Sequence, residues 1–115
     1  MSGSLMIQRV TDAAITINGE AYSQNIALTP EEVLANWAAK PVADLAEADF
    51  EYLLSKTPEI VLLGTGRQNL FPPRELLFAF ARRGIGLESM DTAAAARTFN
   101  VLATEGRQVA AVLYL

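Results

Sequence analysis

The 115 residues are 51% hydrophobic and 19% charged, which fits one compact domain spanning residues 1–115 and excludes a largely disordered chain. Nine basic and 13 acidic side chains give a formal net charge of −4, so a nucleic acid backbone is a poor electrostatic partner. Cysteine and histidine are both absent, which excludes disulfides, thiolate nucleophiles, imidazole bases and zinc sites built on those residues.

The first predicted elements are short strands. Residues 13–28 alternate apolar and polar side chains around Asn18-Gly19, a dipeptide typical of a type I′ hairpin turn. We expect two antiparallel strands around this turn and a third strand at residues 25–28.

Two helices are predicted next, because the pattern of a helix N-terminal capping box occurs twice. The sequence TPEEVLANWAAK (residues 29–40) starts with this pattern and predicts a short helix, with an extended segment anchored by Trp37 as the alternative. Asp44 and Glu47 repeat the pattern, and apolar residues at helical spacing then continue to Thr57.

The second half of the chain alternates strand and helix patterns. The expected elements are a buried strand at 59–63, a helix from Pro72 to Gly84, a buried strand at 85–90, an alanine-rich helix from Asp91 to Gly106 and a strand at 108–115. Right-handed crossovers make the first strands of such a unit parallel. We therefore predict an α/β fold: a mixed β-sheet with an N-terminal hairpin, a C-terminal βαβαβ unit and helices packed on the sheet.

The connection VLLGTGRQNLFPPREL (residues 61–76) has features of a phosphate-binding loop but lacks the decisive ones. No Lys-Ser or Lys-Thr pair follows its glycines, which excludes a P-loop. The GTG at 64–66 with Glu88 about 20 residues later partly fits a dinucleotide fingerprint. The third glycine is missing, however, and the prolines at 72–73 remove N–H donors from the helix start. The simplest interpretation is a tight turn from a strand into a helix.

This connection still lies where α/β proteins place their sites, beyond the carboxyl end of a strand. Arg67, Gln68 and Asn69 would be exposed there as hydrogen-bond donors. Glu88 and Asp91, which follow in the next strand and turn, are carboxylates that could join them. Either carboxylate could instead end a strand or cap a helix, and no catalytic residue is predicted.

The last helix offers a second polar surface. Arg97, Asn100 and Thr104 gather on one side of its helical wheel, and the alanines at 93–96 permit close approach of another backbone. A solvated helix face is the alternative. The predicted ligand- or partner-binding residues are Gly64, Thr65, Gly66, Arg67, Gln68, Glu88, Arg97 and Asn100. No metal ligand and no cofactor is predicted.

Phe78 departs from the apolar stripe of its helix. It points away from Leu76 and Phe80 and lies among charged residues. An isolated exposed aromatic, or packing under a neighbouring segment, is the simpler interpretation, and the alternative is a partner contact, for which Phe78 is the predicted interface residue.

The motifs LLGTG, FPP, RRGIGLESMDT and AARTFNVLATEGRQVAAVL resemble a small family of unknown function that includes bacterial and archaeal proteins and the mitochondrial respiratory complex I assembly factor three. The resemblance implies a compact α/β domain and a turn with extended chain near Trp37, and it supplies no catalytic residue. The positions that match its motifs are Gly64, Thr65, Gly66, Phe71, Pro72, Gly84, Glu88, Met90, Thr92, Arg97, Thr98 and Asn100.

The resemblance also implies protein partners, with respiratory complex subunits as candidates. The leading hypothesis is a non-catalytic binding module that assists assembly of a larger complex. The rival is a small-ligand or anion-binding protein, or a cofactor-free enzyme, using the loop at Gly64–Gly66. The chain starts without a signal or import pattern and has no apolar run near 20 residues, so we expect a bacterial cytoplasmic protein without membrane insertion, either alone or as a weak homo-oligomer.

Overall fold

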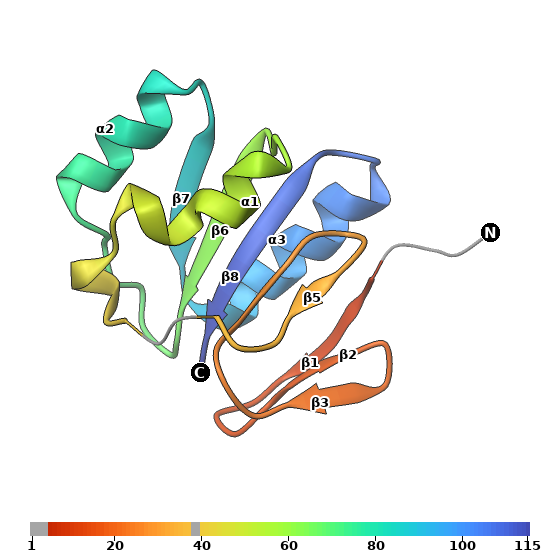
Figure 1. Ribbon diagram of the computed structural model, residues 1–115. Helices are drawn as coiled ribbons and strands as arrows, with labels where there is room; N and C mark the ends of the chain where they lie inside the picture. Colours follow the sequence, from red (N-terminus) through yellow and green to blue (C-terminus); the bar gives the residue numbers. More distant parts are fainter. Residues whose placement is uncertain (1–4, 38–39) are drawn as a thin grey trace.

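Two β-sheets and the helices around them form three layers in the computed structural model, which describes residues 5–37 and 40–115 (Figure 1). The larger sheet is the middle layer. Helices α1 (Glu51–Ser55) and α2 (Arg74–Arg82) cover one face of it. Helix α3 (Thr92–Thr104) and the smaller sheet cover the other face.

Five strands make the larger sheet. They are β4 (Ile26–Leu28), β5 (Val33–Leu34), β6 (Ile60–Thr65), β7 (Gly86–Met90) and β8 (Val109–Tyr114). Their order is β5-β4-β8-β6-β7, and β6 runs parallel to both β7 and β8, whereas β4 is antiparallel to β5 and β8. The predicted mixed sheet and the parallel strands of the C-terminal βαβαβ unit are confirmed.

β6 is buried on both faces because it lies between two strands and between two layers of helices. Val61 and Leu63 face the layer that contains α1 and α2, and Leu62 faces α3. All three side chains have no exposed surface. The continuous apolar run that predicted a fully buried strand thus has its expected cause.

The smaller sheet contains the predicted hairpin. It consists of β1 (Ile7–Val10), β2 (Ile15–Ile17) and β3 (Glu20–Tyr22), in that order and antiparallel. Asn18 and Gly19 connect β2 to β3 with φ values of 48° and 88°, as a type I′ turn requires. The third strand expected at 25–28 exists as β4, but it pairs with β8 in the larger sheet rather than with the hairpin.

The helix predicted at residues 29–40 is wrong over the described part of that segment. The Thr29 hydroxyl does accept a hydrogen bond from a nearby N–H, that of Glu31, at 3.2 Å. The chain then turns back as β5, because the Thr29 N–H donates to the Glu32 carbonyl at 3.0 Å and closes a hairpin with β4. The extended chain implied by the family resemblance is what occurs, and Ala38 and Ala39 lie outside the described residues.

The helix predicted after Asp44 starts later and is shorter than expected. Residues Val42–Asp44 and Glu47–Phe50 form two 3₁₀ turns, η1 and η2, before α1 begins. Asp44 is not the cap. The Asp49 carboxylate instead accepts the Ala46 N–H at 2.8 Å at the start of η2.

The prediction that residues 85–90 form a buried strand is wrong in its burial. β7 is an edge strand rather than a strand buried on both faces, and its Gly86 and Glu88 are exposed. The neighbouring helices match their predictions better: Asp91 caps α3 by accepting the Ala94 N–H at 2.8 Å, and Gly84 follows α2 with a φ of 72°.

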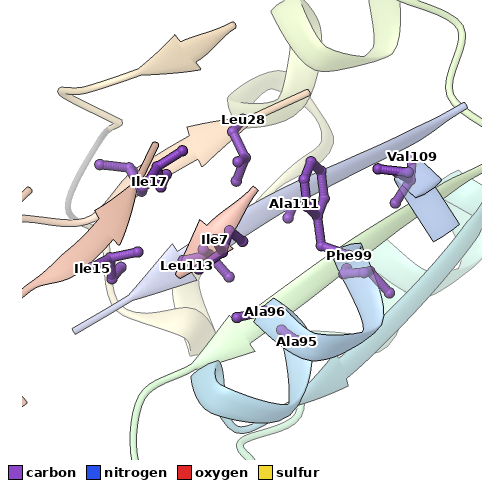
Figure 2. Packing of buried hydrophobic residues seen from close by; sticks show 13 residues of the cluster. Ile7, Ile15, Ile17, Leu28, Ala95, Ala96, Phe99, Val109, Ala111 and Leu113 are labelled. Carbon is purple, nitrogen blue, oxygen red and sulfur yellow. The ribbon is translucent and has the colours of Figure 1, made fainter. Parts of the chain in front are cut away.

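Two apolar cores lie on the two faces of the larger sheet. On one face, Phe99 of α3 belongs to one apolar cluster with side chains of the smaller sheet and of β8, which Figure 2 draws as sticks. On the other face, Phe50 contacts Phe80 edge to face, with ring centroids 5.2 Å apart. The smaller sheet is therefore anchored through α3.

Candidate functional site

The exit of β6 is held against α3 by an unusually close backbone contact. A Cβ atom added to Gly64 would lie 2.9 Å from the Thr92 Cα, 3.0 Å from the Leu113 side chain and 3.1 Å from the Ala95 Cβ. Only a residue without a side chain fits there. The alanines of α3 do permit a close approach, as their small size indicates.

Two buried threonines bind backbone groups of this loop. The Thr65 hydroxyl lies 2.6 Å from the Gln68 carbonyl, to which it donates, and it accepts the Leu70 N–H at 2.9 Å. The Thr92 hydroxyl accepts the Gly66 N–H at 2.8 Å and donates to the Tyr114 carbonyl at 2.6 Å. The Gly66 N–H is therefore engaged inside the fold rather than free to bind a phosphate.

A cavity of about 260 Å³ lies on the outer side of this loop. It is bounded by the β1–β2 turn, the loop, the start of α3 and the end of β8. Arg67 and Asp12 both line it and form an ion pair at 3.3 Å, but both side chains are more than two-thirds exposed. An ion pair so exposed contributes little stability, so Arg67 can turn toward another anion at little cost.

A second cavity of about 210 Å³ lies along the groove between β1 and α3. Arg97 and Asn100 line it, together with Arg9. Val10 and Ala93 line both cavities, so Arg67 and Arg97 border adjacent cavities rather than one shared pocket.

Asn100 holds β1 onto α3. Its side-chain oxygen accepts the Ile7 N–H at 2.9 Å and its side-chain nitrogen donates to the Ile7 carbonyl at 2.8 Å. β1 is paired with β2 on one side only, and these bonds satisfy the backbone of Ile7 at its other edge. A structural role thus accounts for Asn100, and its binding role stays a prediction.

We expect Asn100→Ala to loosen β1 and to lower the free energy of unfolding by about 1 to 2 kcal/mol, because both backbone groups of Ile7 lose their partner. Amide hydrogen exchange across Ile7–Val10 measures the local effect. Asn69→Ala, at an exposed loop position, is the matched control and should leave exchange in β1 unchanged. Equal protection of β1 in both variants would contradict the role assigned to Asn100.

The remaining predicted site residues are dispersed. Gln68 is exposed in the loop, with its carbonyl bonded to Thr65. Glu88 is paired in register with Leu62 on the edge strand β7 and lines neither of the two cavities described above. Asp91, by contrast, borders the first cavity while capping α3.

One titratable group with a shifted pKa, Tyr114, lines the first cavity, and Asp49 lines neither cavity. Burial raises the pKa of Tyr114 to about 12, and the Asp49 carboxylate adds to the rise, so the phenol stays protonated and donates to the Lys40 carbonyl. Burial acts to raise the pKa of Asp49, but the Ala46 N–H and Lys40 outweigh it and hold this pKa below its ordinary value. These shifts have structural causes. Within residues 5–37 and 40–115, no three carboxylates cluster as metal ligands.

Residues 70–78, which run from the loop into α2, expose four apolar side chains, of which sequence analysis identified only Phe78. We call this set the α2 surface; its exposed apolar side chains are Leu70, Phe71, Leu77 and Phe78, at 46%, 76%, 38% and 55% exposure. The signal was available in the sequence, because Phe71 precedes two prolines that hold it outside both the strand and the helix.

Residues 7–114 match the family described as "Protein of unknown function (DUF498/DUF598)". The chain belongs to this family. It is 34% identical over 112 residues to "NADH dehydrogenase [ubiquinone] 1 alpha subcomplex assembly factor 3" of Rattus norvegicus, which covers 96% of this chain but 60% of that protein. A crystal structure of a Bordetella parapertussis protein, 33% identical, superposes with a TM-score of 0.89 and covers 98% and 97% of the two chains. The family resemblance seen in the sequence is confirmed.

Another relative has a name that concerns location. The "13 kDa major membrane protein" of Francisella tularensis is 31% identical over 72 residues, which is 63% of this chain and 58% of that protein. No helix in the described part of this chain has the length and apolar character needed to cross a bilayer.

Proposed function

We propose that this protein is a non-catalytic protein-binding module that assists assembly of a larger complex. The α2 surface carries the proposal, because four large apolar side chains within residues 70–78 are exposed, and the FPP motif of the family at residues 71–73 lies in the same segment. The name of the Rattus norvegicus relative, an assembly factor, supports it. Since this chain spans about 60% of that protein's length, respiratory subunits as partners remain part of the proposal.

The organisation of the glycine loop supports binding rather than catalysis. Thr65 and Thr92 bind the loop's backbone from within, and the exposed side chains of loop residues 67–69 are an arginine and two amides. Such groups recognise surfaces and anions but are not ready acids or bases near neutral pH. The cytoplasmic location predicted from the sequence belongs to the same proposal.

Affinity capture of the tagged chain from the cells that produce it, followed by mass spectrometry, tests the function. We expect respiratory complex subunits or their assembly proteins to be enriched roughly tenfold over a tag-only control, as a Kd in the micromolar range permits. A Gly86→Ala variant, altered on the edge strand β7 outside residues 70–78, should capture the same proteins.

The same experiment addresses the rival function. The cavity beside Arg67 has a volume of about 260 Å³ and is bordered by Asp91, so it has room for a small ligand only. Isolation of the protein with a metabolite and without protein partners would support that rival and contradict the assembly proposal.

A further inference from the structure

The outward ridge of α2 places one aromatic ring between two arginines. Arg74, Phe78 and Arg82 follow one another at four-residue spacing, so they lie on one line along the helix. The opposite side of α2 is buried through Leu76 and Phe80. This ridge therefore points away from the core and toward solvent.

The arginines of this ridge are not committed to the fold. Among the residues that the structure describes, the ion pairs of α2 and its cap involve only Arg83, which binds Glu47 at 2.6 Å. Arg74 and Arg82 are exposed and flank Phe78, which is 55% exposed. Their charges are thus available to a partner.

The charge of this surface contrasts with that of the chain. Residues 74–83 contain three arginines and one glutamate, a net charge of +2, whereas the whole chain carries −4. Arg83 is paired with Glu47, and three carboxylates line a cavity together with Arg82, those of Asp44, Glu47 and Glu75. The attraction of this ridge for an acidic partner therefore rests on Arg74 and Arg82 themselves, which form no ion pair among the described residues.

We propose that the ridge Arg74-Phe78-Arg82 is a docking site for an acidic, amphipathic helix of a partner protein. The proposal rests on the proposed function and names the chemistry of its partner. Arg74 and Arg82 lie about 12 Å apart along the helix axis, at 1.5 Å per residue. A partner helix matches them with two carboxylates eight residues apart and an apolar side chain midway that packs on Phe78.

A second copy of this chain is a poorer occupant. If two α2 helices packed antiparallel about Phe78, each Arg74 would face an Arg82 of the other copy, and like charges would oppose the contact. The charge pattern of the ridge thus favours a different, acidic partner over self-association.

The direct test uses a helical peptide of about 16 residues with two glutamates eight residues apart and a leucine midway on the same ridge. We expect this peptide to shift the NMR amide signals of residues 70–83 in the full chain. A matched peptide with lysines in place of the glutamates should leave these signals unshifted. Arg74→Glu/Arg82→Glu should bind the glutamate peptide roughly tenfold more weakly and should bind the lysine peptide instead.

A second pair of variants separates the ring from the charges. Phe78→Ser should weaken binding of the glutamate peptide severalfold. Val101→Ser, which changes an α3 residue of 56% exposure, should leave this binding unchanged. Shifts outside residues 70–83, equal binding of both peptides, or a molar mass that shows dimers through α2 would each overturn the proposal.

Capture from cells distinguishes this proposal from the broader function. If Arg74→Glu/Arg82→Glu and Phe78→Ser still capture the partners of the parent chain, the docking site is wrong while the binding function stands. If the parent chain captures no protein partner, the function itself fails. Loss of the captured partner in both variants, with Val101→Ser unaffected, is the result expected.

Discussion

Gly64→Ala should destabilise this protein more than any other single methyl added to its glycines, by about 3 kcal/mol. The new Cβ would lie 2.9 Å from the Thr92 Cα, which is backbone and cannot rotate away. It would also press on the Leu113 side chain and on Ala95. Relief requires α3 to move off the sheet, which opens the core that anchors the smaller sheet.

Thermal and denaturant unfolding of purified Gly64→Ala measure this effect, and the midpoint temperature should fall by roughly 10 to 20 °C. Gly86→Ala is the matched control in the neighbouring strand, because its Cβ would lie 3.4 Å from the Ile60 side chain, an ordinary contact. It should change the free energy of unfolding by less than about 1 kcal/mol. Equal stability of the two variants would show that α3 does not pack on β6 as described.

Thr92→Val should lower the free energy of unfolding by about 2 to 3 kcal/mol, although valine has nearly the same shape as threonine. Valine cannot accept the Gly66 N–H or donate to the Tyr114 carbonyl, so two part-buried backbone groups lose their partner. The glycine loop and the end of β8 should then separate from α3. Denaturant unfolding gives the loss of stability, and faster amide exchange at Gly66 locates it.

Thr98→Val is the control for this variant. Its hydroxyl donates to the Ala94 carbonyl at 3.0 Å, which already accepts a bond within the helix, so the loss should stay below about 0.5 kcal/mol. If Thr92→Val is as mild as Thr98→Val, the hydroxyl of Thr92 does not hold the loop. Partner capture by Thr92→Val would then be expected to match that of the parent chain.

The candidate site was predictable in part. The sequence placed the glycine loop at the exit of a buried strand, and it identified Phe78 as exposed on its helix. It did not predict that Asn100 binds Ile7, because these residues are 93 positions apart and no local pattern pairs them. The separation of Arg67 and Arg97 into adjacent cavities likewise depends on β1, a strand the periodicity did not reveal.

The sequence alone determined the elements whose signals are local: the Asn18-Gly19 hairpin, the buried strand β6, and the helix α3 with its Asp91 cap. Only the tertiary structure decided which strands pair, why the segment after Thr29 returns as β5 beside β4 instead of forming a helix, and why β7 is an edge strand. The physical reason is the distance along the chain over which each interaction acts. Turn preference and apolar periodicity act within a few residues, whereas strand order and the burial of Thr92 depend on contacts between segments that only the folded core brings together.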